Sequence, residues 1–545
     1  MKIRQLNSRE QRKQSTGTIT TRPAESNAAP EDGRARVNPW LIAAAVILPT
    51  FMEVLDTTIV SVSLPNIAGN LSASISEATW VQTSYLISNA IVLPASAWFS
   101  SFLGRKRFFL TCVAIFTAAS ALCGFAPSLG VLIVARVLQG AGGGALQPLS
   151  QAILLESFPP AKQGQAMGVW AVGVIVAPVL GPLLGGWITD SYSWRWLFYI
   201  NLPVGLLALV MILRFISDPA YVQANKPRRI DAVGFALLTL WLGTLQTVLD
   251  KGQDEDWFSA PWICWFTAIS ITSLIALLIW ELRTTDPIIN LRVLANRNFA
   301  VGTVLAFVVG VVSYSPLTLL PLFLQNLMGY NALQNGFAQC PRGIGALLAM
   351  PLVGMLTSKV DSRKLIIVGT ILSGVAAFAM SNIDLDVAKS SFVVANLIQG
   401  AGLAITFVPL ATTAMGLLRK EQMGSATGLF NLFRNLGGSV GIAMVTTMVA
   451  RGSQAHQATL VTHLTPLDPP FQSRLQAMEA ALAQQVTAAQ AHVMAPGAIY
   501  KSLLQQSSLL AFVDDFRWLA LLCFLSIAVV LCFKKVSVKG GVSVH

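Results

Sequence analysis

Apolar segments of about 20 residues recur along the chain from Trp40 onward. Each segment is long enough to cross the roughly 30 Å hydrocarbon core of a bilayer as an α-helix. We predict fourteen such helices, at 40–63, 79–99, 108–127, 130–152, 166–188, 197–216, 232–249, 262–281, 299–321, 336–356, 364–381, 392–415, 424–449 and 512–533. The pattern indicates an all-α polytopic membrane protein.

The composition agrees with this class. Hydrophobic residues make up 54% and charged residues 11% of the 545 residues, whereas soluble domains contain roughly 25% charged residues. Most of the 37 Lys and Arg residues lie near the two ends of the chain and in every second loop. This bias is expected when both termini are cytoplasmic. The formal charge of +12 therefore reflects topology, and we expect no nucleic-acid partner.

The two ends of the chain differ from the rest. Residues 1–37 are polar and contain no apolar run, so we predict a disordered basic cytoplasmic tail rather than a cleaved signal peptide. Residues 534–545 form a second predicted cytoplasmic tail.

An internal repeat indicates how the helices are grouped. The sequence VARVLQGAG at 134–142 recurs as VANLIQGAG at 394–402. The same shift carries Gly164 and Gly168 onto Gly424 and Gly428. Duplication explains one offset over two consecutive helices, so we expect six-helix bundles at 38–216 and 299–533. The linker between them, 217–298, would hold two extra helices. Transporters built from such repeats bind their substrate near the midplane, between the halves.

Two acids and one base lie inside predicted spans. Glu53 and Asp56 are three positions apart on one helical face, and Arg136 lies in another span. Charges at membrane depth are costly and mark functional sites. Two neighbouring carboxylates repel each other, so we expect at least one of them to bind and release protons, with Arg136 as the counter-charge. A static ion pair between two helices is the alternative.

Two polar stripes are candidates for a substrate cavity. Gln82, Tyr85 and Asn89 lie on one face of the span 79–99, and Asn431 and Arg434 share a face of the span 424–449. We expect these side chains to line a watered cavity. Hydrogen bonding between helices is the alternative for the first stripe.

A ladder of small residues and prolines occupies the span 166–188. Small residues at helical spacing let two backbones approach closely, and proline removes a backbone hydrogen bond. The ladder therefore predicts a helix that packs tightly and bends. Its members are Gly173, Pro178, Gly181, Pro182, Gly185 and Gly186.

The types of chemistry that the sequence lacks are also informative. No His lies in a predicted span, and the six Cys residues show no C-x-x-C spacing. We therefore predict no metal site, and no nucleophile and base of an enzyme at membrane depth.

The longest outside segment runs from 451 to 510. Leu475, Met478 and Leu482 show helical spacing in its middle. We expect a surface helix there, and a docking site for an external partner is the sharper hypothesis.

Five motifs carry a family resemblance. They are LDTTIVSVSLP at 55–65, LIVARVLQGAGGG at 132–144, GVIVAPVLGPLLGG at 173–186, WRWLFYINLPVG at 194–205 and DAVGFALLTLWLGTLQTVLDKGQDEDWF at 231–258. Together they resemble the fourteen-helix drug:proton antiporters of the major facilitator superfamily, in the EmrB/QacA subfamily. The resemblance covers nearly all of residues 40–533.

The resemblance implies roles for particular residues. Asp56 and Arg136 would respond to protons and substrate, and the run 177–186 would be the antiporter motif at the contact between halves. Gly104, Arg105 and Lys106 match the cytoplasmic loop motif of the family. A periplasmic adaptor and an outer-membrane channel would be partners of the segment 451–510.

The chain departs from the family at four positions, one of which is Ser358 in the second-half counterpart of the loop motif, GMLTSKVDSRK at 354–364. Ala97 and Ser101 stand where the loop motif usually has glycine and aspartate, and Glu53 is an acid that many relatives lack. Ser101 cannot form the ion pair that the aspartate makes in relatives.

These observations lead to one expected function. We expect a multi-pass transporter of the bacterial cytoplasmic membrane that exports amphipathic or hydrophobic toxic compounds in exchange for protons. It would use alternating access and the proton motive force, without a cofactor. Export of an endogenous metabolite, lipid or siderophore by the same antiport is the alternative.

Overall fold

The computed structural model describes residues 38–218, 231–285, 287–330, 332–357, 360–385, 389–419, 422–465 and 468–534. The predicted tail at 1–37 lies outside these residues, as does all of the tail at 534–545 except Lys534. Part of the expected linker, 219–230, also lies outside them.

Every regular element among the described residues is a helix, which confirms the all-α class. Eleven of these helices are long and apolar enough to cross a membrane, and a bent helix at 162–191 is a twelfth. The two predicted spans without a match among these twelve are 336–356, which falls in α15 (Ala332–Leu356), and 512–533, which falls in the second half of α20 (Ala488–Val530). Both contain charged residues: Arg342 in α15, and Asp514, Asp515 and Arg517 in α20. The count of fourteen spans stays a prediction.

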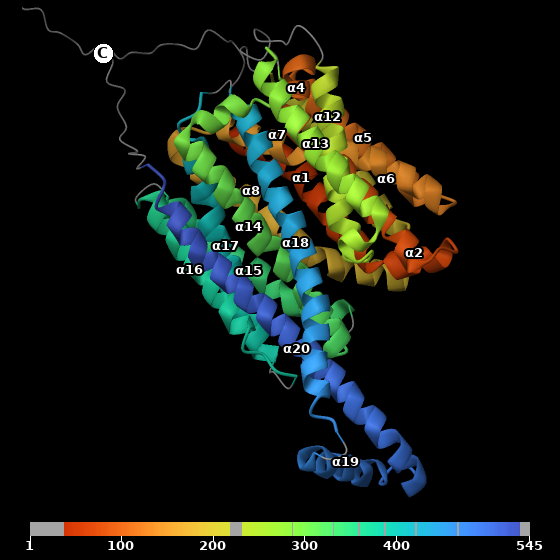
Figure 1. Ribbon diagram of the computed structural model, residues 1–545. Coiled ribbons are helices and arrows are strands. Elements are labelled where there is room, and N and C mark those ends of the chain that lie inside the picture. Colours follow the sequence, from red (N-terminus) through yellow and green to blue (C-terminus); the bar gives the residue numbers. More distant parts are fainter. Residues whose placement is uncertain are drawn as a thin grey trace, which may run out of the picture. The chain divides into compact units, whose positions relative to one another are not determined.

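The helices of the first repeat form the N-half, residues 38–218 (Figure 1). One predicted span, 130–152, is divided into two helices at Gly144 and Ala145. The long helices of this half are α1 (Pro39–Val62), α4 (Trp80–Leu103), α5 (Arg105–Phe125), α6 (Leu129–Gly143), α7 (Leu146–Ser157), α8 (Pro160–Ser191) and α10 (Asn201–Phe215). Three short helices join them: α2 (Leu64–Asn70), α3 (Ile75–Ala78) and α9 (Trp196–Tyr199).

The second repeat forms the C-half, residues 297–534 (Figure 1). Its helices besides α15 and α20 are α14 (Arg297–Leu322), η3 (Phe323–Leu327), α16 (Ser362–Met380), α17 (Lys389–Met415), α18 (Met423–Val461) and α19 (Pro469–Leu482). The segment that joins the two halves along the chain contains four helices: α12 (Ala232–Lys251), η1 (Trp257–Ser259), α13 (Pro261–Arg283) and η2 (Leu291–Ala295).

Of the two inserted helices, α12 lies against the N-half. Lys251 of α12 donates to the Thr79 hydroxyl at 2.5 Å, and Thr83 of α4 donates to Asp250. The α13 helix packs on α12, where the Ser270 hydroxyl donates to the Trp241 carbonyl at 3.4 Å. Trp265 of α13 is 70% exposed, as expected for a helix that faces lipid.

Corresponding glycines of the repeat make corresponding contacts. A Cβ at Gly140 would collide with the Tyr85 carbonyl of α4, and one at Gly400 would collide with the Arg342 carbonyl of α15. Gly142 lies against α5 in the same way that Gly402 lies against α16. Both copies therefore use glycine where two helix backbones touch, which supports duplication.

The segment 451–510 contains more helix than the sequence analysis expected. The α18 helix continues to Val461, α19 covers 469–482, and α20 begins at Ala488. These parts form an extension in which α19 packs on α20 (Figure 1). The Gln457 amide donates to the Tyr500 hydroxyl at 2.9 Å across it. The apolar pattern ends near 449, whereas α18 and α20 are helical beyond their apolar runs. The predicted spans 424–449 and 512–533 are therefore shorter than the helices that contain them.

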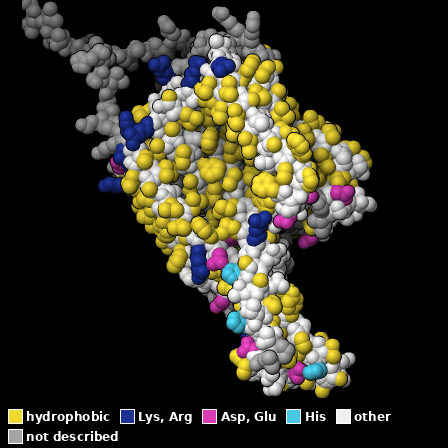
Figure 2. Space-filling model, in the orientation of Figure 1, with side chains coloured by type: hydrophobic (Ala, Val, Ile, Leu, Met, Phe, Trp, Pro, Cys, Tyr) yellow, Lys and Arg dark blue, Asp and Glu magenta, His cyan; other side chains and the backbone are white. Residues whose placement is uncertain are grey.

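The surface of the helices is largely apolar. Figure 2 shows hydrophobic side chains over most of the visible face of the bundles, with His side chains on the extension. Large exposed apolar residues include Val134, Leu206 and Leu348. An apolar patch of this size on a helical surface is what a bilayer covers, so the protein is a multi-pass membrane protein.

Candidate functional site

Both predicted acids lie on α1 and face the interior of the N-half. Glu53 is 3% exposed and Asp56 is not exposed at all. Residues three apart in a helix project from neighbouring parts of one face. The structure nevertheless places the two carboxylates in separate hydrogen-bond networks.

Asp56 forms the centre of the first network. Arg136 of α6 donates from Nη1 to Asp56 Oδ2 at 2.6 Å, and both side chains are fully buried. Gln139 and Asn201 each donate to Asp56 Oδ1 at 2.9 Å. A buried ion pair needs such additional hydrogen bonds to offset the loss of water. The sequence analysis paired Asp56 with Arg136, and the geometry brings them into contact.

The Arg136 guanidinium is held on several sides. Its Nε donates to the Val81 carbonyl at 3.0 Å, and Nη1 also donates to Gln139 at 2.7 Å. The Tyr85 ring lies 4.2 Å from the guanidinium carbon, a cation–π distance. Nη2 has no hydrogen-bond partner among the described residues. The position of the charge is therefore fixed, and one of its donors is unused.

Glu53 forms the second network, which contains no cation in direct contact. Asn89 donates to Glu53 Oε1 at 3.0 Å, and Gln147 of α7 donates to Oε2 at 2.8 Å. The Tyr85 hydroxyl lies 3.5 Å from Oε1. Within the described part of the chain no Lys, Arg or His forms an ion pair with Glu53. Glu53 can therefore gain a proton without breaking an ion pair, unlike Asp56.

Gln147 connects Glu53 to the C-half. Its side-chain oxygen accepts a hydrogen bond from Arg434 of α18, while its nitrogen donates to Glu53. One turn away, Asn431 donates to Gln151 of α7 at 2.5 Å. Both contacts join α7 of the N-half to α18 of the C-half.

A cavity of about 70 Å³ lies between the halves. Trp170, Val174 and Pro178 of α8 line one side of it, and Arg342 and Arg434 line the other. The Trp170 ring stacks on Phe407 with centroids 6.0 Å apart. The Arg342 guanidinium donates to the Ser313 carbonyl at 2.7 Å.

The predicted cavity residues are divided by the structure. Arg434 lines the cavity, whereas Gln82, Tyr85, Asn89 and Asn431 are not among its lining residues. Tyr85 and Asn89 contact Glu53, so the polar stripe of α4 makes hydrogen bonds between helices. Gln82 is half-buried and takes no part in the bonds of Glu53 or Asp56 within the described residues. Tyr85 and Asn89 make the contacts that the alternative expected, and lining of a watered cavity by this stripe stays a prediction.

The glycines of α8 face α1. A Cβ at Gly181 would collide with the Thr58 side chain, and one at Gly185 would lie 2.8 Å from the Ile59 carbonyl. The helix bends by 41° between Pro178 and Leu180, where proline removes a backbone hydrogen bond. On its other side, α8 meets Gly336 of the C-half through Leu183. Gly173, Pro182 and Gly186 lie in the same helix, which therefore packs closely on α1 and contacts the second half.

The loop motif at 104–106 is held by acids that were not evident from the sequence. Arg105 forms an ion pair with Glu156 of α7 at 2.6 Å, and both side chains are largely buried. Asp218 accepts a hydrogen bond from the Lys106 backbone amide at 2.6 Å. Gly104 adopts a φ of +90°, which side-chain-bearing residues rarely do. Acidic side chains therefore contact this motif even though Ser101 replaces the usual aspartate.

Three amides of the two networks were not evident from the sequence. Gln139, Gln147 and Asn201 touch Asp56 or Glu53, but none was singled out. Gln139 lies one turn after Arg136, which is the spacing at which helical side chains meet. Asn201 and Gln147 come from other helices, so only the fold reveals their partners.

The described residues contain no group of three or more His, Cys, Asp or Glu side chains that could hold a metal ion. The groups that are gathered here are two carboxylates, arginines and amides. The carboxylates can bind protons, and the arginines and amides can exchange hydrogen bonds with them.

Comparison with known proteins identifies the family. The profile of the Major Facilitator Superfamily matches residues 46–442. The multidrug export protein EmrB of Haemophilus influenzae is 36% identical over 511 residues, which cover 91% of this chain and 95% of that protein. The fatty acid resistance protein FarB of Neisseria gonorrhoeae is 37% identical over 422 residues, 77% of this chain and 82% of that one.

A solved structure supports the fold independently. The human organic anion transporter MFSD10 superimposes with a TM-score of 0.58 at 15% identity, covering 90% of this chain and 99% of that one. At this identity the likeness concerns the fold alone. With the two-bundle repeat and the sequence matches, it confirms the resemblance: the chain belongs to the Major Facilitator Superfamily and is one of its EmrB-like members.

Proposed function

We propose that the protein is a proton-coupled multidrug efflux transporter of the bacterial cytoplasmic membrane, with both termini cytoplasmic. The observation that carries the proposal is the buried Asp56–Arg136 pair with Glu53 one turn away in a separate network. Relatives that cover most of the chain are named as multidrug export proteins. Those names favour drug export over export of an endogenous metabolite, lipid or siderophore.

Proton binding at Asp56 would release Arg136. The ion pair requires an ionised carboxylate, and a neutral Asp56 no longer offsets the buried positive charge. Arg136 would then pair with water or another anion. A proton and a donor group of the substrate would compete for the Asp56 carboxylate, and such competition is what antiport requires.

Glu53 would transmit its protonation state to the interface of the halves. Gln147 donates to Glu53 and accepts from Arg434. A proton on Glu53 weakens the Gln147 amide's interaction with a carboxylate, and the amide is then free to turn away from Arg434. Loss of the α7–α18 bond would favour separation of the halves at that point, as alternating access requires.

The substrate would bind between the halves, in the cavity beside Trp170, Phe407 and Arg434. Aromatic walls suit hydrophobic or amphipathic compounds. The cavity of about 70 Å³ is smaller than a drug, so we expect it to enlarge when the halves move. Transport would be driven by the proton motive force, without a cofactor or chemical conversion of the substrate.

The test uses purified protein in proteoliposomes that contain a pH-sensitive dye. Export from a pump-deficient bacterium first identifies compounds from a panel. For those compounds, the native protein should show drug-driven proton movement and Asp56→Asn should show none. Asp190→Asn, which changes an exposed carboxylate in the last turn of α8, should transport normally. Normal coupled transport by Asp56→Asn would contradict the proposal.

We also propose that the extension at 451–510 docks a periplasmic adaptor that leads to an outer-membrane channel. Val493, Tyr500 and Leu504 lie on one face of α20, and Val493 is 78% exposed. The test is co-purification with a candidate adaptor, comparing the native chain with Val493→Asp/Tyr500→Asp. Unchanged adaptor binding by this variant would argue against docking at this face.

A further inference from the structure

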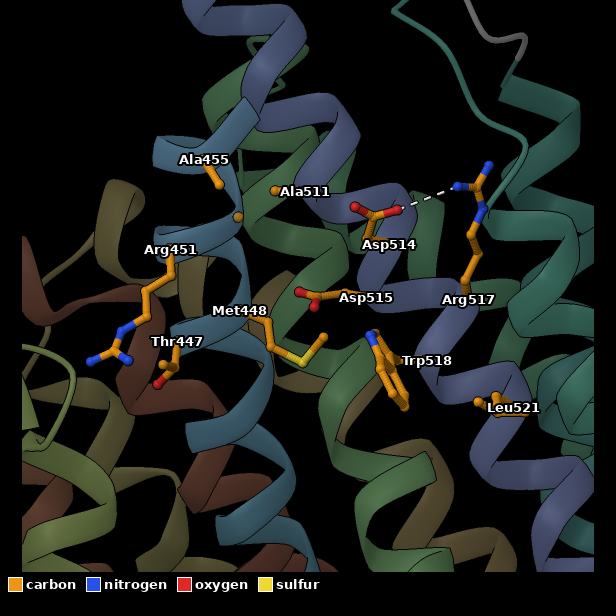
Figure 3. Close-up of a pocket in the computed structure, with 11 residues that line it drawn as sticks. Thr447, Met448, Arg451, Ala455, Ala511, Asp514, Asp515, Arg517, Trp518 and Leu521 are labelled. Atoms are coloured by element: carbon orange, nitrogen blue, oxygen red, sulfur yellow. Dashed lines mark hydrogen bonds and ion pairs between the residues drawn. The ribbon is translucent and has the colours of Figure 1, made fainter. Parts of the chain in front are cut away.

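A second pocket lies between α18 and α20, where both helices enter the extension (Figure 3). Its volume is about 560 Å³, within the range of pockets that take drug-sized molecules. The pocket belongs to the C-half alone. It shares no lining residue with the cavity between the halves.

Asp515 is the unusual residue of this pocket. Its side chain is completely buried, and it points from α20 toward Met448 of α18 (Figure 3). Neither of its carboxylate oxygens has a hydrogen-bond partner among the described residues. Burying a carboxylate without a partner is strongly unfavourable. Binding of a group that pairs with Asp515 would therefore be favoured.

The neighbouring charges do not supply that group. Arg517 pairs with Asp514 at 3.3 Å, and His456 contacts the other oxygen of Asp514 at 2.9 Å. Arg451 extends to the far side of α18, where it lies 3.6 Å from Asp256 (Figure 3). The two arginines that line the pocket therefore contact other acids, and Asp515 has no cationic partner within the described part of the chain.

The rest of the wall suits an apolar ligand with a positive charge. Met448 and Leu521 provide flexible apolar surface, and the Trp518 ring is 53% exposed one turn from Asp515. An indole face attracts cations, most strongly when the cation is poorly hydrated. A carboxylate and an indole beside apolar side chains form a receptor for an amphipathic cation.

We propose that this pocket binds an organic ammonium cation that carries an apolar body, with Asp515 as its counter-charge and Trp518 stacked on it. The cation is either a soluble amphipathic amine or the amine headgroup of a phospholipid. Both sources present the same chemistry to Asp515. Binding here is separate from antiport through Asp56, so it is tested without a proton gradient.

The experiment uses photolabelling of the full chain in nanodiscs of phosphatidylglycerol. Azido-ethidium, an aromatic quaternary cation, is the probe, and labelled peptides are mapped by mass spectrometry. Saturable labelling is expected on the peptides that contain Met448 and Trp518. Asp515→Asn, which preserves the shape of the side chain, should lower this labelling at least tenfold, because a buried charge partner is lost. Asp515→Glu keeps the carboxylate and should retain most of it.

Further measurements separate a binding defect from misfolding and identify the source of the cation. A melting temperature of Asp515→Asn equal to or above that of the native chain would show that the variant is folded. Lower labelling in discs that also contain phosphatidylethanolamine supports a lipid amine as the occupant, and equal labelling supports a soluble cation. Labelling of Asp515→Asn at the native level, or labelling that maps only to other helices, would overturn the proposal.

Discussion

Arg434 of α18 donates a hydrogen bond to Gln147 of α7, the same amide that donates to Glu53 at 2.8 Å. Arg434 of the C-half and Glu53 of the N-half are therefore linked by two hydrogen bonds through the Gln147 side chain. Amides suit this position because they donate and accept at once. The link makes Gln147 the residue through which Glu53 and the interface between the halves affect each other.

Replacing Gln147 should weaken both the fold and transport. Gln147→Leu leaves Glu53 without one donor and Arg434 without its acceptor, and an unsatisfied buried polar group costs about 1–3 kcal/mol. We expect a lower melting temperature in detergent and at least several-fold slower drug export. Gln82→Leu is the matched control, because half-buried Gln82 bonds to neither acid. Equal effects of the two substitutions would remove any special role of Gln147.

The Asp56–Arg136 pair should show strong coupling in stability. Asp56→Asn leaves a buried guanidinium uncompensated, and breaking a buried pair in this way costs about 3–5 kcal/mol. Arg136→Gln in the same chain removes that charge, so the double variant should recover most of the lost stability. Melting temperatures of the four proteins measure this coupling.

Transport should respond differently from stability. The double variant Asp56→Asn/Arg136→Gln has no titratable carboxyl at this position, so drug-driven proton movement should stay absent even when the fold recovers. A static ion pair predicts that transport recovers together with stability. The two quantities therefore discriminate between a coupling site and a purely structural pair.

The charges at membrane depth could be predicted from the sequence because they contrast with their apolar surroundings. Glu53, Asp56 and Arg136 are conspicuous for this reason, and the repeat at 134–142 and 394–402 indicated two bundles. The all-α class followed from the period and length of the apolar runs.

Partners that come from distant helices could not be predicted in this way. Gln147 and Asn201 are 94 and 145 residues from the acids they contact, and polar amides in apolar helices are too common to be informative. Asp515 lies at the start of a predicted span, where charges are usual at the membrane boundary. Only the packing of α20 on α18 shows that it is buried without a partner.

The ion pair between Arg105 and Glu156 should stabilise the loop motif at 104–106. The two side chains are 2.6 Å apart and largely buried, so their interaction should exceed that of a surface pair. We expect a double-mutant cycle with Arg105→Gln and Glu156→Gln to give a coupling energy of about 1–3 kcal/mol. Lys106→Gln is the control for the loss of a positive charge from this motif, since the exposed Lys106 ammonium contacts only the Leu213 carbonyl among the described residues. We expect it to change the melting temperature less than Arg105→Gln does. A coupling energy near zero would show that the pair contributes little.

The close packing of α8 on α1 should make Gly185 sensitive to a single methyl group. A Cβ at Gly185 would lie 2.8 Å from the Ile59 carbonyl, a backbone atom that cannot turn aside. Gly185→Ala should therefore displace α8 from α1, with a cost of about 1–3 kcal/mol, and should lower drug export several-fold.

Gly168→Ala provides the control within the same helix. Its Cβ would lie 3.5 Å from the Met350 sulfur, an ordinary contact with a flexible side chain, so export and melting temperature should change little. If both variants behave like the native protein, α8 has room to shift, and its glycines are not needed for close contact. If Gly185→Ala loses export but keeps its melting temperature, the contact with α1 matters for movement of the helix rather than for its stability. That result would place the function of the ladder in the change of conformation, because a methyl group would then oppose only the states in which α8 lies closer to α1.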